Sequence, residues 1–556
     1  MGLLRRPFIP ELLIITISAL LFVPFLGGLH LFDWDEINFA ESAREMIVTR
    51  DYLTVRINFE PFWEKPPLFF WMQVASMKIF GISEFAARFP NAICGMVSLL
   101  VLYRTGRRIY SEAFGLLWVL VYIGSLLPFF YFKSGIIDPW FNLFIFLGLL
   151  QFIFFLESEK SGKRWGLLVL SASLLGLAVL TKGPVAVLLF GMTVLGYWIL
   201  KKFRLQINAI EIIVFIVVLA LVGGLWFLLQ ILNGNYDIIS DFITYQVRLF
   251  RTQDAGHGGF FGYHFVVMLL GVFPASVFAL LGFRISYYDD PFQKRFKLWM
   301  MVLFFVVLVI FSIVRTKIVH YSSLCYFPLT FLGACVVSRI IQGKIRFNRW
   351  IYYVYAVIAV VYGLLSIALP FVLINKQSII QKGWIQDEFA EGQLQAAVNW
   401  SGAEAAIGII FVLGIILTLV LIARKKKAGY YLLFINTTVF ILLTILIITP
   451  RIEGYTQGAL IEFCKERQTE DCYVETVGMK SYAHYYYTNK QIPDNPEADN
   501  KDWLLTGNID KPAYFILRNR SVPKFREKYP ELYLFREKNG FVFLRRDPVS
   551  AEPGPN

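Results

Sequence analysis

Charged residues are scarce in this chain, and their scarcity excludes several classes of protein. Only 17% of the 556 residues are charged and 57% are hydrophobic, whereas a soluble globular protein has roughly a quarter of its residues charged. The mean hydropathy is +0.58. This balance excludes a globular, disordered or collagenous chain. Apolar runs long enough to cross a bilayer recur along most of the sequence, which predicts a polytopic membrane protein in contact with lipid.

Cysteine is also scarce, and five cysteines do not make the disulfide framework of a small secreted domain. Cys464 and Cys472 lie in the polar tail, where they could pair in an oxidising compartment. The formal net charge of +13 is not carried by any basic domain, so no nucleic-acid partner is expected. Lys and Arg instead form short clusters between apolar runs, as is typical of loops that set membrane orientation.

Apolar runs of roughly 18–24 residues, the length of a spanning helix, predict about thirteen spans. The first follows Arg5 and Arg6, and because no small-residue cleavage site follows it, we expect an uncleaved helix. The others centre near residues 96, 120, 147, 172, 191, 220, 271, 306, 330, 362, 413 and 439. Six basic clusters fall on one side, which the positive-inside rule makes cytoplasmic. The N-terminus is then cytoplasmic and the tail periplasmic, in a bacterial inner membrane.

Two regions differ in composition from the apolar runs. The first periplasmic loop, at 33–82, is amphipathic at helical spacing and places Glu41, Arg44 and Glu45 on its polar side, which predicts helices in the plane of the interface. The tail at 450–556 alternates short apolar stretches with charged segments, which predicts a small periplasmic α/β domain. The expected fold is therefore an all-α transmembrane domain over residues 1–449, followed by that domain.

Polar residues gather at the outer ends of the predicted spans, where ionisable groups commonly mark functional sites. They come from distant segments and comprise Asp35, Glu36, Glu64, Lys65, Asp138, Lys182, Arg248, Arg251, His257, Arg315, Lys317, His320 and Tyr321. Any one of them also has a structural interpretation, such as Asp138 as a helix cap. Their concentration on one side nevertheless favours a site.

These residue types suit transfer chemistry with a phosphate leaving group. A carboxylate beside an apolar pocket can act as a general base toward an attacking nucleophile. Lys, Arg and Tyr side chains can hold a phosphate and stabilise its departure. Glu64 and His257 could share a divalent metal, zinc or magnesium, although two ligands alone do not make a complete site.

Five short motifs occur in order on this face. They are Asp35-Glu36 with Ala40-Glu41, Glu-Lys-Pro-Pro-Leu at 64–68, Thr-Lys-Gly-Pro at 181–184, His257 with Gly271 and Pro274, and Lys317 with Tyr321 and Pro328. With these motifs the sequence resembles the polyprenyl-phosphate-dependent membrane glycosyltransferases. It is most similar to the lipid A aminoarabinose transferase branch, which is related to the protein O-mannosyltransferases. The resemblance implies thirteen membrane helices, interfacial helices and an outer soluble domain.

The resemblance also implies roles for single residues. The catalytic carboxylates would be Asp35 and Asp138. A second group would hold the phosphate of the lipid-linked donor, namely Lys65, Arg248, Arg251, Lys317 and Tyr321. Glu64 and His257 match positions that can hold a metal, and Glu36 and Lys182 are further site candidates.

The expected activity is transfer of a sugar from a polyprenyl (undecaprenyl) monophosphate carrier to a lipid or other envelope acceptor on the periplasmic face. Nucleotide sugars are confined to the cytoplasm, so no nucleotide cofactor is expected. Transfer to a protein acceptor and a lipid-sugar flippase or transporter are the alternatives, although transporters usually have repeated halves. Phe39 and Phe62 replace tyrosines of the closest branch, and Tyr245-Gln246 replaces its Glu-His pair. The identities of the transferred sugar and of the acceptor therefore stay open.

Overall fold

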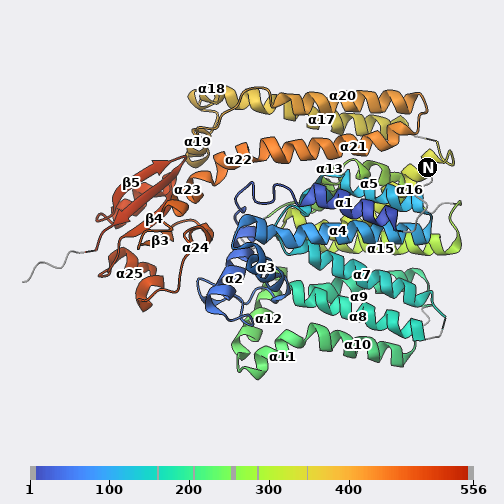
Figure 1. The fold of residues 1–556 in the computed structure, drawn as a ribbon, viewed down its shortest axis with the longest axis horizontal. Helices are drawn as coiled ribbons and strands as arrows, with labels where there is room; N and C mark the ends of the chain where they lie inside the picture. The colour runs from blue at the N-terminus through green and yellow to red at the C-terminus, as the bar shows by residue number, and fades with distance from the viewer. Residues whose placement is uncertain are drawn as a thin grey trace, which may run out of the picture.

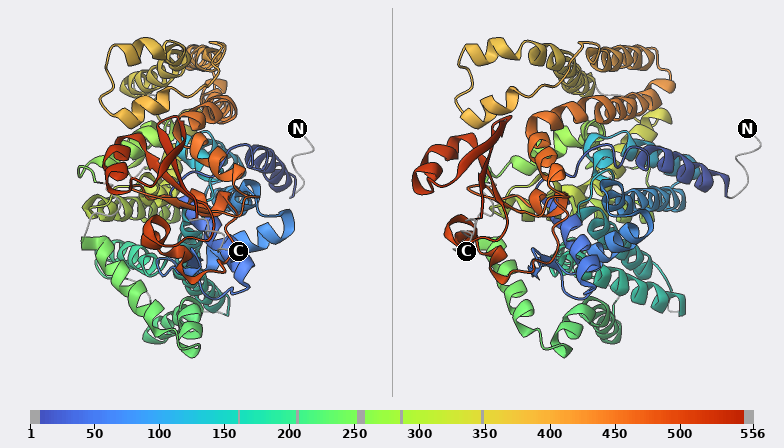
Figure 2. Two further views of the ribbon diagram at one scale, coloured as in Figure 1. Left: turned by 90° about the vertical axis from the view of Figure 1, so that its left-hand side faces the viewer. Right: turned by 60° about the vertical axis from the view of Figure 1, so that its left-hand side comes forward.

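Long helices run side by side through most of the molecule, and a small sheet lies at one end of the bundle (Figure 1). The structure is a computed structural model. It describes residues 8–159, 162–204, 207–251, 258–284, 287–346 and 349–548, with the side chains of 249–251 outside that description. Figure 2 shows helices of residues 349–423 at the top margin and those of residues 209–251 at the bottom margin, with the sheet between them.

Among the described residues, eight helices are long and apolar enough to cross a bilayer. They are α4 (Glu84–Ile109), α7 (Asp138–Leu156), α8 (Gly162–Lys182), α15 (Pro291–Ile313), the run of η2 (Val319–Cys325) and α16 (Tyr326–Ile341), α17 (Arg349–Ile374), α20 (Ala405–Ala423), and the run of α21 (Ala428–Leu443), η3 (Thr444–Ile448) and α22 (Thr449–Thr456). Two bent pairs raise the number to ten, namely α10 (Ala209–Gly223) with α11 (Leu225–Leu232), and α13 (Tyr263–Gly271) with α14 (Ala275–Gly282). The chain is a multi-pass membrane protein.

The predicted number of about thirteen spans is not confirmed. Every predicted span overlaps an apolar helix, but α1 (Ile9–Phe22), α5 (Glu112–Ile123) and α9 (Val185–Leu200) have only 14, 12 and 16 residues. A spanning helix needs about 20 apolar residues. The pair α13–α14 bends by 113°, which the length of an apolar run does not reveal.

The first outer loop folds into two helices joined by a short hairpin. In order these elements are α2 (Asp35–Thr49), β1 (Arg56–Ile57), β2 (Glu60–Pro61) and α3 (Leu68–Phe80). Asp35 and Glu36 occupy the first turn of α2, where the helix dipole favours negative charge. The helix ends at Arg50, whose φ of 58° is left-handed.

The first loop forms helices as predicted, and their placement in the plane of the interface stays a prediction, but the polar side of α2 is buried against protein. Glu41, Arg44 and Glu45 are each 0% exposed. Two guanidinium nitrogens of Arg44 donate to the Glu41 carboxylate at 2.7 Å, and a third donates to Asn489 at 3.3 Å. The C-terminal region thus covers this side of α2, and amphipathic spacing alone does not distinguish a protein partner from water.

The C-terminal region forms a four-stranded sheet in the order β3-β4-β6-β5, in which only the β3–β4 pair is parallel. The strands are β3 (Tyr473–Thr476), β4 (Ala513–Arg518), β5 (Tyr533–Lys538) and β6 (Phe541–Arg546). The helices of this region are α23 (Gly458–Glu466), α24 (Ala483–Tyr487), α25 (Lys501–Thr506) and α26 (Val522–Lys528). Phe463 stacks on Phe543 at a centroid distance of 4.1 Å, which joins α23 to the sheet. A separate domain at 450–556 stays a prediction, and Cys464 and Cys472 are both free thiols.

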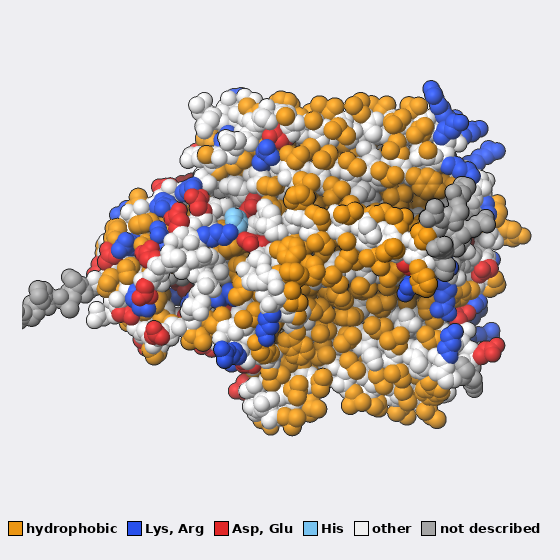
Figure 3. Space-filling model, viewed as in Figure 1, with side chains coloured by type: hydrophobic (Ala, Val, Ile, Leu, Met, Phe, Trp, Pro, Cys, Tyr) orange, Lys and Arg blue, Asp and Glu red, His pale blue; other side chains and the backbone are white. Residues whose placement is uncertain are grey.

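A band of hydrophobic side chains covers the helices between two ends that carry charged side chains (Figure 3). The connection from α20 to α21, which holds Arg424, Lys425, Lys426 and Lys427, lies at the end far from the sheet (Figure 1). The first loop and the sheet occupy the other end. The apolar band is the surface that a bilayer would cover, so the site described next lies at one rim of that band.

Candidate active site

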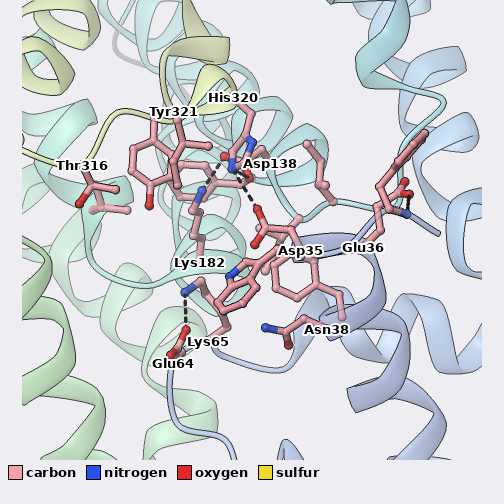
Figure 4. Close-up of a pocket in the computed structure, with 18 of the residues that line it drawn as sticks. Asp35, Glu36, Asn38, Glu64, Lys65, Asp138, Lys182, Thr316, His320 and Tyr321 are labelled. Atoms are coloured by element: carbon pink, nitrogen blue, oxygen red, sulfur yellow. Dashed lines mark hydrogen bonds and ion pairs between the residues drawn. The ribbon is translucent and has the colours of Figure 1, made fainter. Parts of the chain in front are cut away.

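A cavity of about 380 Å³ opens between the first loop, the ends of several membrane helices and the C-terminal region. Its ionisable and aromatic lining includes Trp34, Asp35, Glu36, Glu64, Lys65, Asp138, Lys182, Tyr245, His320, Tyr321, Lys480 and Tyr482. These side chains come from α2 and the residue before it, the segment between β2 and α3, α7, α8, η2, the helix α12 (Tyr236–Arg251) and the segment after β3. The structure therefore brings widely separated residues of the sequence into one cavity (Figure 4).

Two aspartates are joined through a histidine at the centre of the cavity. His320 Nε2 lies 3.3 Å from a carboxylate oxygen of Asp35 and 3.8 Å from one of Asp138. The other oxygen of Asp138 accepts from the ammonium of Lys182 at 2.5 Å. The Asp35 side chain is 31% exposed and that of Asp138 is 4% exposed. Asp35 is therefore the more accessible of the two carboxylates, while Asp138 is enclosed between Lys182 and His320 (Figure 4).

Helix ends position these groups. Asp35 begins α2 and Asp138 begins α7, so both carboxylates lie at helix N-termini, where partial positive charge favours an anion. Lys182 is the last residue of α8, before the glycine and proline that end the helix. His320 belongs to the short helix η2.

A second group of side chains forms a cationic and aromatic wall beside the aspartates. The ammonium of Lys65 lies 3.8 Å from the Glu64 carboxylate and 5.1 Å from the centre of the Tyr245 ring. The ammonium of Lys182 lies 5.1 Å from the centre of the Tyr321 ring. Burial lowers the pKa of Lys65, and this effect exceeds the opposing attraction of Glu64. An anion bound beside Lys65 would favour its charged form.

Glu36 lines the cavity, but its carboxylate is already engaged. It is 3% exposed and pairs with Arg88, which is equally buried, at 2.7 and 3.1 Å. Arg88 also donates to the carbonyls of Leu26, Leu29 and His30 at 2.8 Å. The pair therefore attaches the start of α2 to α4 and to the connection between α1 and α2, which is a positioning role.

Some predicted residues are not brought to the cavity. Lys317 does not line it, and its ammonium donates to the carbonyls of Phe311, Ser312 and Val314 at 2.5–3.0 Å. Arg248 is exposed and lies over the Tyr245 ring, at 5.1 Å from its centre, without lining the cavity. The Arg251 side chain and His257 lie outside the described residues.

The predicted metal pair, Glu64 and His257, stays a prediction. The described neighbour of Glu64 is the Lys65 ammonium, which suits a carboxylate without a metal. Within the part of the chain that the structure describes, no group of three or more His, Cys, Asp or Glu side chains could hold a metal ion.

Among the lining residues, His320, Lys480 and Tyr482 have no role predicted from the sequence. His320 stands one position before Tyr321 and was grouped with the polar loop residues, but its bridging position between two aspartates depends on the fold. Lys480 and Tyr482 belong to the tail. Nothing in their sequence neighbourhood indicates that they lie beside residues of the first loop.

The described geometry can be compared with known proteins. The family model for dolichyl-phosphate-mannose-protein mannosyltransferase matches residues 64–226, which begin at the second of the five motifs. Solved structures of ArnT from Cupriavidus metallidurans are similar over nearly the whole length. The one bound to undecaprenyl phosphate has a TM-score of 0.72 and 17% identity, covering 99% of this chain and 100% of that chain. The apo structure has a TM-score of 0.73 and 16% identity, covering 98% and 99%. The fold is therefore that of ArnT.

Curated proteins that resemble this chain in sequence carry the same kind of name as the solved structures. The undecaprenyl phosphate-alpha-4-amino-4-deoxy-L-arabinose arabinosyl transferase of Pectobacterium atrosepticum is 26% identical over 354 residues, 61% of either chain. The protein of that name from Photorhabdus laumondii is 25% identical over 367 residues, 65% of either chain. The chain thus spans about three fifths of the length of the curated relatives it matches. The predicted resemblance is confirmed: the chain resembles the polyprenyl-phosphate-dependent glycosyltransferases, and among them the aminoarabinose transferase branch.

Proposed function

We propose that this chain is an inner-membrane glycosyltransferase that moves a sugar from a polyprenyl monophosphate carrier to a lipid A-like acceptor on the periplasmic face. The observation that carries the proposal is the row Lys182–Asp138–His320–Asp35 beside Lys65 in one cavity. The relatives named for undecaprenyl phosphate, and a solved structure with that lipid bound, support the carrier.

Asp35 is the proposed general base. It takes a proton from the acceptor oxygen, or orients that oxygen, as the oxygen attacks the anomeric carbon of the donor sugar. His320 contacts Asp35 at 3.3 Å and restrains the direction of its carboxylate. Asp138, held by Lys182, lies on the other side of the same imidazole. The acceptor oxygen gains the bond to the anomeric carbon.

Lys65 and Tyr321 are the proposed partners of the leaving phosphate. The bond from the anomeric carbon to the phosphate oxygen breaks, and the electron pair leaves with the lipid phosphate. The ammonium of Lys65 and the hydroxyl of Tyr321 can stabilise the charge that develops there. Because burial lowers the pKa of Lys65, a bound anion should favour its charged form.

The proposed topology places this chemistry outside the cytoplasm. Counting both bent pairs and the short apolar helices α1, α5 and α9 as spans, with α3 kept in the outer loop, brings the number among the described residues to thirteen. The N-terminus is then cytoplasmic and residues 450–556 form a periplasmic domain. Nucleotide sugars do not reach that side, so a sugar carried on lipid is the donor that this orientation requires.

The sugar itself stays open in this proposal. Phe39, at a position where the aminoarabinose branch tends to have tyrosine, lines the cavity and contacts Phe69 and Phe70 edge-on. An apolar ring there cannot accept or donate a conventional hydrogen bond. Carriers loaded with aminoarabinose, mannose or glucose are therefore separate arms of the test.

The test measures release of polyprenyl phosphate from sugar-loaded carriers by the purified full-length protein. Asp35→Asn should reduce release by at least about 100-fold, the scale of general base catalysis, with unchanged expression. The matched control is Asp502→Asn, which removes an exposed carboxylate in α25. Undiminished release by Asp35→Asn would overturn the assignment. Movement of the intact carrier across a bilayer without release would indicate a flippase instead.

Transfer to a protein acceptor is the second candidate, and the match to the protein mannosyltransferase family over residues 64–226 favours it. Labelled donor separates the two candidates. Label recovered in phosphorylated lipid A supports the lipid acceptor, and label recovered only in protein supports the second candidate.

A further inference from the structure

The C-terminal region contributes a cation and an aromatic ring to the cavity. The ammonium of Lys480 lies 4.5 Å from the centre of the Trp34 ring and 5.9 Å from that of Tyr482. The two rings contact each other at a centroid distance of 5.6 Å. All three residues line the cavity, and Trp34 directly precedes Asp35. Trp34, Lys480 and Tyr482 are called the outer rim below.

Lys480 differs from the other lysines of the cavity in its partners. Lys65 is paired with Glu64, and Lys182 with Asp138. The imidazole of His320 lies beside Asp35. Lys480 has no carboxylate within 4.0 Å among the described residues, and its ammonium contacts only aromatic faces. Its positive charge is therefore available to an anion that enters the cavity.

The outer rim combines two kinds of surface that suit one kind of ligand. The rings of Trp34 and Tyr482 offer flat apolar faces, and the adjoining ammonium offers three hydrogen-bond donors and a charge. A headgroup that combines a sugar ring with a phosphate or carboxylate would use both surfaces. Because Trp34 and Asp35 line the same cavity, a headgroup held on the rim would enter the cavity that contains the carboxylate proposed to receive its proton.

We propose that the outer rim is an acceptor subsite that binds an anionic, sugar-bearing lipid headgroup, so that the C-terminal region takes part in selecting the acceptor. This inference rests on the proposed function, because it assigns the acceptor side of the same cavity. The donor phosphate is assigned to Lys65 and Tyr321 instead.

The first experiment measures binding, which needs no turnover. The full-length protein in detergent is titrated with lipid A that carries its phosphates and with the same lipid after phosphatase treatment. Lys480→Ala should weaken binding of phosphorylated lipid A by about tenfold, the effect of losing one charge-assisted hydrogen bond. Binding of the dephosphorylated lipid should change little. Lys480→Arg keeps the charge and should retain most of the affinity.

The chain offers a matched control in Lys382. Its ammonium lies 4.9 Å from the centre of the Trp384 ring, and Trp384 is 70% exposed. Lys382 does not line the cavity. Lys382→Ala therefore removes the same charge and the same kind of aromatic contact elsewhere, and it should leave the affinity for both lipids unchanged. An equal loss in both variants would overturn the subsite.

The second experiment separates acceptor from donor. Binding of polyprenyl phosphate alone should be unchanged by Lys480→Ala and weakened by Lys65→Ala. If Lys480→Ala weakens binding of polyprenyl phosphate as much as binding of lipid A, Lys480 serves the donor and the acceptor subsite is wrong. If Lys480→Ala leaves both affinities unaltered, the subsite is also wrong.

The two proposals fail in distinguishable ways. Lipid A binding that depends on Lys480, in a protein that releases no polyprenyl phosphate from any loaded carrier, would overturn the transferase and keep the subsite. Release of polyprenyl phosphate with an acceptor KM that Lys480→Ala does not change would keep the transferase and overturn the subsite.

Discussion

At the scale of single residues, burial changes the acid–base chemistry of Glu45 in α2. Its carboxylate accepts from the backbone N–H groups of Asn58 and Phe59 at 2.6 and 2.8 Å and is 0% exposed. Burial raises the pKa of Glu45 from 4.5 to about 8, and the neighbouring Glu41 carboxylate also raises it, against the lowering effect of Arg44. Glu45 is therefore protonated in the folded protein at pH values where the unfolded chain is ionised.

This shift predicts a pH dependence of stability. Between about pH 4.5 and about pH 8 the folded state binds more protons at Glu45 than the unfolded state, so the free energy of unfolding should fall as pH rises. Glu45→Gln removes the titration and should make thermal unfolding in detergent less dependent on pH over that range. The control is Glu537→Gln, an exposed glutamate on β5. Identical pH profiles for Glu45→Gln and the unchanged protein would contradict the assignment.

Part of the candidate site could be predicted from single residues and their motifs. Asp35, Lys65, Asp138 and Tyr321 lie next to the ends of apolar runs, and the sidedness of the basic clusters put them on one face before any fold was known. Their roles stay predictions. The place of Lys480 could not be predicted, because its contact with Trp34 depends on how the tail packs on the first loop, and hydrophobic periodicity carries no information about that packing.

At the scale of elements, the segment that leads into α2 is held by the C-terminal region. The side-chain amide of Gln457 donates to the carbonyl of Leu31 at 2.8 Å and accepts from the N–H of Asp33 at 3.1 Å. The N–H of Leu31 donates to the hydroxyl of Tyr487 at 2.7 Å. Gln457 is 8% exposed. These bonds fix the backbone two residues before Asp35, so Gln457 is a positioning residue.

We expect Gln457→Ala to lower kcat for release of polyprenyl phosphate with a much smaller change in the donor KM. A displaced carboxylate costs up to about 100-fold in rate, whereas the phosphate contacts of Lys65 stay in place. The matched control is Gln393→Ala, which removes a 2.9 Å bond from a half-buried glutamine amide to the carbonyl of Thr456. A change in donor KM without loss of kcat would contradict the positioning role.

Helices were more predictable than their ends. Apolar run length indicated α4, α7 and α15 because a long hydrophobic segment has few alternatives to a membrane helix. The break between α13 and α14 falls at Pro274, which cannot continue a helix, but its 113° angle and the short length of α5 do not follow from apolar run length. The burial of the polar side of α2 was missed because amphipathic spacing does not distinguish a protein partner from water.

At the scale of the whole molecule, an apolar band separates two charged ends (Figure 3). The end far from the sheet includes the basic connection at 424–427, and the other end holds the cavity. The proposed orientation puts the basic end in the cytoplasm.

Single-cysteine labelling checks that orientation in intact cells. Lys524→Cys in α26 should react with a membrane-impermeant maleimide, whereas Lys426→Cys should react only after permeabilisation. Both lysines are exposed, so access depends on the membrane alone. The unchanged chain, whose five cysteines are buried or half-buried, gives the background. The reverse labelling pattern would contradict the orientation.

The bonds from Leu31 and Asp33 to Gln457 and Tyr487 join positions that are 424 to 456 residues apart. A nascent chain leaving the ribosome inserts its early helices long before those partners are synthesised. The proposed active site is therefore completed late in biogenesis. A translation product that ends before Tyr487 should insert its membrane helices and show no transfer activity.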